Sequence, residues 1–227
     1  MTDYPHRTCL RDAIPEIAQA ATFLDEAANA YLAGDRTEAI RLINAADIRA
    51  IDEWSISIMG KFTEHNRPIS PLGDPPIRPL AERSKPRMPS AALKKALHDQ
   101  FGYRCCFCGI PVIRKSVRIR LTSLFPELLR GDGTKFTKNA MIRVMEAQYD
   151  HVLPHSRGGA TSFENMLITC APCNYGRWHF TLGEMGLVDP RSRQLVRSNW
   201  DGLERFMRSD IPGCSVPSFQ VTPGINV

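Results

Sequence analysis

Apolar residues in the first third of the chain recur at three- and four-residue intervals, the spacing of helices with one buried face. Three such stripes follow one another, bounded by Ile14 and Tyr31, Ala39 and Ala46, and Ile48 and Phe62. Gly34 can end the first helix, and the side chain of Asp35 can cap the second. We therefore predict an N-terminal helical bundle over residues 1–66.

The helical spacing stops in residues 67–89, which hold seven of the 17 prolines of the chain. Proline lacks an amide donor and fixes φ, so this stretch cannot be a regular helix or an inner strand. We predict an extended, Pro-rich connector. Ser90 can then cap a helix with Leu93, Leu97 and Phe101 on its inner side.

Farther along, the pattern changes to short apolar runs. Residues 149–154 and 166–169 have strand character, Gly158 and Gly159 form a turn between them, and Pro172 suits the first turn of a helix. This predicts the order strand, loop, strand, helix. In residues 191–227 we expect one helix and an irregular tail, the inward residues being Trp200, Leu203, Phe206 and Met207.

Composition is typical of a globular protein, with 43% apolar and 23% charged residues. No apolar run is long enough to span a membrane, and the polar start has no export signal, so we expect a cytoplasmic protein. Charge is unevenly distributed: residues 1–80 carry a net −4 and residues 81–227 a net +9. We expect the basic part to meet a polyanion and the acidic part to meet protein.

Four of the seven cysteines form two CxxC pairs, Cys105 with Cys108 and Cys170 with Cys173. In a reducing compartment such pairs hold metal, and two of them complete a tetrahedral zinc site. A closed site of four thiolates is structural, so we expect zinc to stabilise the fold. The 61 residues between the pairs require an inserted substructure, and Cys106 is expected to be a bystander.

The residues around the second pair occur in a recognisable order: Asp150 and His151, the GlyGly turn, Asn165 before an apolar run, and CxxC followed by Asn174. In this the chain resembles HNH endonucleases of the subgroup whose ββα-metal motif is framed by two zinc knuckles. The resemblance implies an α+β fold that is mainly helical. A small ββα-metal nuclease core on a four-cysteine zinc site would occupy residues 90–190, preceded by the N-terminal bundle.

The resemblance also implies roles for single residues. His151 would be the general base that activates water, and Asp150 and Asn174 would hold one catalytic Mg²⁺ or Mn²⁺. Asn165 would tie the loop and orient His151, although Asn also brackets turns without direct chemistry. Nucleic-acid contacts would come from Arg157, Arg177 and His155, although His155 is otherwise an accessory ligand or merely a loop side chain.

The function implied is metal-dependent hydrolysis of DNA phosphodiester bonds, with slight sequence specificity. Control would come from a protein partner or from assembly through the N-terminal helices, and a bacterial defence effector is one role that such proteins fill. Two alternatives remain. One is a catalytically silent, zinc-stabilised nucleic-acid-binding module, and the other is a nuclease that acts on RNA, since the implied site has no use for a 2′-hydroxyl.

Overall fold

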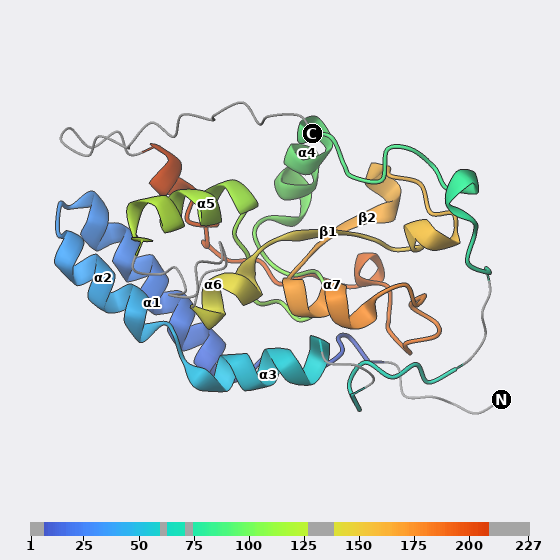
Figure 1. The fold of residues 1–227 in the computed structure, drawn as a ribbon, viewed down its shortest axis with the longest axis horizontal. Coiled ribbons are helices and arrows are strands. Elements are labelled where there is room, and N and C mark those ends of the chain that lie inside the picture. Colours follow the sequence, from blue (N-terminus) through green and yellow to red (C-terminus); the bar gives the residue numbers. More distant parts are fainter. Residues whose placement is uncertain (1–6, 60–62, 71–74, 127–138, 209–227) are drawn as a thin grey trace, which may run out of the picture.

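The computed structural model describes residues 7–59, 63–70, 75–126 and 139–208 (Figure 1). Its helices are α1 (Pro15–Leu32), α2 (Arg36–Ala45), α3 (Arg49–Met59), α4 (Ala91–Phe101), α5 (Lys115–Leu124), α6 (Ala140–Met145) and α7 (Ala171–Arg177). Two strands, β1 (Gln148–His151) and β2 (Met166–Thr169), form the sheet. Short 3-10 helices are η1 (Leu80–Glu82), η3 (His155–Arg157), η4 (Phe163–Asn165), η5 (Pro190–Ser192) and η6 (Glu204–Arg208). A mainly helical α+β fold is thus confirmed.

The three N-terminal helices occur where the spacing predicts them, and the Asp35 carboxylate caps α2 by accepting from the Glu38 amide at 2.9 Å. A separate bundle is not confirmed. Helices α1 and α2 pack on each other, but α3 packs mainly on α6 and α7 (Figure 1). Asp47, which precedes α3, accepts from the amide of Ala140 at the start of α6, at 2.7 Å. The amino-terminal helices therefore share one hydrophobic core with the rest of the chain.

Gly176 in α7 shows how closely α3 and α7 approach each other. A Cβ atom at this position would lie 2.7 Å from side-chain carbons of both Ile58 and Leu10. Because real carbon atoms do not approach so closely, only glycine fits here without a shift of the neighbouring chain. This contact fixes α7 against α3.

The sheet is an antiparallel pair in which Asp150 lies opposite Leu167 and His151 opposite Met166. β2 has the predicted bounds, whereas β1 ends at His151, before the predicted end at Pro154. α7 follows β2 at once, with Cys170 as its N-cap residue and Pro172 in its first turn, as predicted. Helix α4 contacts β2, and α7 contacts β1. The predicted order strand, loop, strand, helix is confirmed.

The predicted helix around Trp200 is wrong in extent, because only the short 3-10 helix η6 forms there. Leu203 and Phe206 are buried as expected, but Met207 is 45% exposed. Phe206 packs on the rings of Tyr31 and Phe125, and so fastens this segment to α1 and α5. Residues 209–227, including Cys214, lie outside the described residues. Among the described helices, none has the length and apolarity needed to cross a membrane.

Candidate active site and four-cysteine cluster

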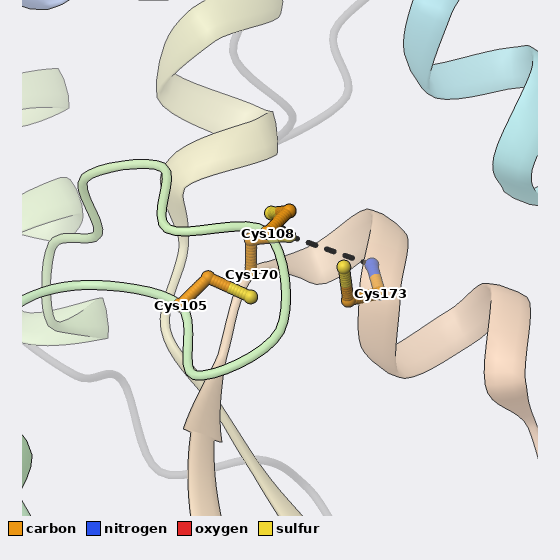
Figure 2. Close-up of side chains that lie close together, drawn as sticks. All are labelled: Cys105, Cys108, Cys170 and Cys173. Atoms are coloured by element: carbon orange, nitrogen blue, oxygen red, sulfur yellow. Dashed lines mark hydrogen bonds between the residues drawn. The ribbon is translucent and has the colours of Figure 1, made fainter. Parts of the chain in front are cut away.

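Four cysteine side chains converge between the loop after α4 and the start of α7 (Figure 2). The sulfur atoms of Cys105, Cys108, Cys170 and Cys173 all lie within 4.8 Å of one another, and those of Cys108 and Cys170 are 3.7 Å apart. Zinc–sulfur bonds of about 2.3 Å in a tetrahedron separate the sulfur atoms by about 3.8 Å. The cluster therefore fits a structural zinc ion, as predicted.

The first CxxC turn, Cys105 to Cys108, is called the first knuckle here, and it joins the cysteine cluster to the sheet. The amide of Cys106 donates to the carbonyl of Ile168 in β2 at 2.8 Å, and Cys106 itself is buried outside the group of four. The amide of Gly109, at φ 75°, donates to the Cys105 carbonyl and closes the turn. A zinc ion held here would cross-link the first knuckle to the strand and helix that border the candidate active site.

His151 is the last residue of β1, and its ring is held by the loop that follows. Its Nε2 atom lies 2.9 Å from the hydroxyl of Thr161, and this hydroxyl donates to the carbonyl of Arg87 at 3.2 Å. Because the hydroxyl has one proton, which goes to the carbonyl, Nε2 is the donor to Thr161. The Nδ1 lone pair is then left as a proton acceptor.

The electrostatic surroundings keep the imidazole neutral. Burial, and then the nearby charges of His155, Arg177 and Arg87, lower the pKa of His151 to about 4. At neutral pH the ring is therefore uncharged, which is the state that a general base requires. Both the tautomer and the charge suit the predicted role.

Asn165 closes the loop between the two strands. Its Oδ1 atom accepts from the amide of Leu153 at 2.9 Å, and its Nδ2 atom donates to the carbonyls of Leu153 and Ala160. Gly159 makes room for this arrangement, since a Cβ there would lie 1.8 Å from the Leu153 carbonyl oxygen. The loop tie expected of Asn165 is present, but the residue that contacts the His151 ring is Thr161.

Asp150 is placed differently from the expectation. Its two carboxylate oxygens accept from Nε and Nη2 of Arg177 at 2.9 and 2.6 Å, and only 1% of the Arg177 side chain is exposed. The same guanidinium donates to the carbonyls of His151 and Phe180. Burial raises the pKa of Asp150 above its usual range, although Arg177 opposes this. Arg177 is therefore a buried structural partner here, which corrects the predicted phosphate contact.

This pairing also bears on the predicted catalytic ion. Arg177 occupies one acceptor position on each Asp150 oxygen, so a divalent ion bound there would have to share the carboxylate with the guanidinium. Among the described residues, the four cysteines are the one group of three or more His, Cys, Asp or Glu donors within metal-binding distance. Since asparagine is not among these donor types, an ion held by Asp150 and Asn174 stays a prediction.

Arg157 is buried as well, with 4% of its side chain exposed. Its Nη2 atom donates to both carboxylate oxygens of Glu184 at 2.8 and 2.9 Å, and the guanidinium also donates to the carbonyls of Pro75 and His179. Its guanidinium therefore binds three parts of the chain together. The predicted contact of Arg157 with nucleic acid disagrees with this placement, because its donors are used inside the protein.

The remaining predicted residues face a cleft of about 670 Å³ that also contains His151. The side-chain amide of Asn174 has no hydrogen-bond partner among the described residues. The Nε2 atom of His155 donates to the carbonyl of Ser84 at 2.7 Å, and its ring lies 5.5 Å from that of His151. His155 is therefore held against the Pro-rich segment while it lines the cleft.

Positive charge predominates in the cleft. Its cationic residues are Arg83, Arg87, Lys94 and Lys115. Besides Asp150, the one carboxylate among the described residues of its lining is Glu146, which pairs with Arg118 at 2.6 Å. The site thus combines a neutral imidazole, a free amide and several cations, which suits a phosphodiester substrate. A second groove of about 740 Å³, between α1 and the first knuckle, contains no histidine.

Sequence reasoning missed Thr161, Ser84 and Arg87, which position the two histidines. No motif marks them, and two of the three lie in the segment interpreted as a connector. The hydroxyl of Thr161, two residues after the GlyGly turn, gives only a weak signal in the sequence. The carbonyl that it contacts, that of Arg87, lies 74 positions earlier in the chain.

Comparison with known proteins agrees with the motif. Residues 133–177 match the family model described as HNH endonuclease. This segment contains both strands, the loop between them, and all of α7. No curated protein and no solved structure matches the chain. The predicted resemblance is confirmed for residues 133–177, while the helices α1 to α5 lie outside the match.

Proposed function

Because residues 133–177 carry an HNH endonuclease domain, we propose that this protein is a nuclease that hydrolyses phosphodiester bonds of DNA. The observation that carries the proposal is the state of His151. Its ring is neutral, its Nε2 atom is fixed by Thr161, and it lines a basic cleft. HNH domains are nucleases as a class, although some members are inactive, so catalysis requires its own test.

The proposed reaction begins with a water molecule between His151 and the scissile phosphate. As the water oxygen bonds to phosphorus, its proton passes to Nδ1 of His151, and the bond from phosphorus to the leaving oxygen breaks. The leaving oxygen takes a proton from solvent. The Thr161 hydroxyl accepts from Nε2 throughout and thereby stabilises the imidazolium that forms.

Charge on the phosphate would be met by residues that line the cleft. The Asn174 amide can donate to a non-bridging oxygen, and the nearby cations lower the energy of the developing negative charge. HNH nucleases use divalent metal ions, and the sequence predicts Mg²⁺ or Mn²⁺. Since the Asp150 carboxylate is bonded to Arg177, we assign no step to such an ion here.

Zinc would be held by the four cysteine thiolates and would supply a cross-link between the first knuckle and α7.

Cytoplasmic location, slight sequence specificity and a role in bacterial defence remain parts of the proposal. We also propose that the acidic α1 and α2 region contacts a protein partner or a second copy. Sedimentation of the full-length protein, alone and in lysate fractions of its host, tests this assembly.

Cleavage of plasmid DNA by zinc-loaded, full-length protein tests the main proposal. Reactions are run with Mg²⁺, with Mn²⁺ and without added ion, and labelled RNA competes in parallel. His151→Ala should lower the rate by roughly 10²- to 10⁴-fold, the usual contribution of a general base. His65→Ala is the matched control, because His65 lies outside the cleft.

Equal rates for His151→Ala and the parent protein would remove His151 from the proposed role. An absence of cleavage by the parent, on DNA and RNA alike, would favour the silent binding module. Preferential cleavage of RNA would keep the mechanism and change the substrate.

Thr161→Val, which keeps the shape of the side chain but loses the hydroxyl, should lower kcat more than it raises KM. Thr161→Ser should restore kcat.

A further inference from the structure

The Pro-rich segment 75–89 lies directly on the loop that positions His151. Figure 1 shows it in teal to green at the edge of the molecule, beside the loop after β1. The amide of Arg78 donates to the Ser156 carbonyl at 2.8 Å, and the hydroxyl of Ser84 donates to the Gly159 carbonyl at 3.1 Å. With the carbonyl contacts to His155 and Thr161, the segment is fixed along much of its length. It forms one wall of the cleft.

This wall presents cations to the cleft. Arg83 and Arg87 come from the segment, and Lys94 and Lys115 line the cleft from α4 and α5. Within the described part of the chain, none of these four forms an ion pair with a carboxylate. Their charge is therefore available to a polyanion that enters the cleft.

The side of the cleft formed by α7 presents aromatic rings to solvent. Tyr175 is 57% exposed and Trp178 is 63% exposed, and both line the same cleft as Asn174. Trp178 sits just after α7 at φ 53°, in the left-handed region that usually holds glycine, and its ring contacts that of His179 at 4.1 Å. Backbone strain of this kind costs stability, and strained residues are concentrated at active sites and ligand-binding sites.

Exposed aromatic rings in one cleft with cations that have no carboxylate partner are features with which proteins bind single-stranded nucleic acid. Bases stack on the rings, and the cations follow the phosphates. In a duplex the bases are already stacked on each other, so flat rings on a cleft wall gain less from it. We propose that the cleft binds an unpaired stretch of a nucleic-acid strand, with Trp178 and Tyr175 stacking on bases and Arg83 and Arg87 contacting phosphates.

This inference rests on the proposed function for its location, but it is tested by binding alone. The probe is a fluorescein-labelled 20-nucleotide oligothymidylate, compared with a duplex of the same length, and fluorescence anisotropy with full-length, zinc-loaded protein gives the two Kd values. Single strands should bind at least tenfold more tightly at equal salt. Equal or tighter binding of the duplex, or no binding of either probe, would overturn the inference.

Trp178→Gly is the informative variant, because glycine adopts φ 53° without strain. It should unfold at the same temperature as the parent or higher, and should weaken oligothymidylate binding by roughly 5- to 150-fold. Phe163→Ala is the control, since Phe163 is 40% exposed but does not line the cleft. An unchanged Kd in Trp178→Gly would refute the stacking role.

The phosphate contacts have a separate signature in the salt dependence. Replacing Arg83 and Arg87 together by Gln should reduce the slope of log Kd against log salt by roughly 1.4, because each phosphate that a cation neutralises on a single strand adds about 0.7 to the slope. Arg49→Gln, at an exposed position on α3, should leave the slope unchanged. An unchanged slope in the double variant would remove these residues from the interface. Strand binding without cleavage of plasmid, single-stranded DNA or RNA would contradict the proposed function alone.

Discussion

Removal of the Arg177 guanidinium tests whether Asp150 belongs to a structural ion pair. In Arg177→Met the side chain keeps much of its length but loses every bond to the Asp150 carboxylate. The carbonyls of His151 and Phe180 lose a donor as well. Asp150 would then be a buried carboxylate without a partner, which is among the most destabilising changes known in proteins.

The expected magnitude follows from the burial of the pair. Breaking a buried ion pair by removing one partner costs about 3–5 kcal/mol, a large part of the total stability of an ordinary domain. For a chain of this size, 1 kcal/mol corresponds to about 2–4 °C, so Tm should fall by roughly 6–20 °C. Arg41→Met is the control, because Arg41 pairs with Glu38 on the exposed surface of α2. It should leave Tm essentially unchanged.

The pH dependence of the variant has a definite sign. Burial already raises the pKa of Asp150, and loss of the guanidinium raises it further. The folded variant therefore binds a proton more tightly than the unfolded chain does. Its stability should rise as pH falls toward the ordinary range of an aspartate, because the buried group becomes neutral. Asp150→Asn in the Arg177→Met background should recover part of the loss at pH 7.

Urea denaturation, followed by tryptophan fluorescence at pH 5 and pH 7, measures these effects. A loss in Arg177→Met no larger than that in Arg41→Met would refute the assignment. A second result would refute it independently: if Mg²⁺ or Mn²⁺ stabilised the parent protein but not Asp150→Asn, the carboxylate would be an ion ligand. The sequence-based expectation would then be restored.

Three other changes should have equally specific results. Chelation of zinc, or Cys173→Ser, should release one zinc ion per chain and unfold the domain, as atomic absorption and circular dichroism would show together. Gly159→Ala should lower Tm and activity because its Cβ would overlap the Leu153 carbonyl, whereas Gly183→Ala, which has open space, should change neither. Burial lowers the pKa of His98, so its contribution to stability is present above the ordinary histidine pKa and is lost as pH falls. His98→Gln should therefore show a flatter profile in denaturation between pH 7 and 5.

The features predicted well from sequence depend on residues close together in the chain. Asp35 and Ser90 cap helices through amides three positions away, and Pro172 marks a first helical turn. The bounds of β2 follow from a run of three apolar residues and the β-branched Thr169. Such elements are set by local spacing and local hydrogen bonds, and these are visible in the printed sequence.

The features that sequence reasoning missed depend on partners far away in the chain. Arg157 and Arg177 look like surface cations until Glu184 and Asp150 are seen beside them, 27 positions away in each case. The segment around Arg87 reads as a spacer because proline excludes regular structure. Its carbonyls, however, remain free to bond to a loop 74 positions later. Composition alone cannot report which carbonyl meets which donor.

The tight contact at Gly176 has a practical consequence for any attempt to divide this molecule. Cutting the chain at the Pro-rich segment would strip α3 from α7 and turn the apolar faces around Ile58 and Leu10 toward water. The excised carboxyl-terminal half would lose α3, which packs against the helix that carries Asn174. A shortened protein that proved inactive would therefore say little about regulation by the removed helices, and single substitutions on the outer surface of α1 and α2 are the sounder route.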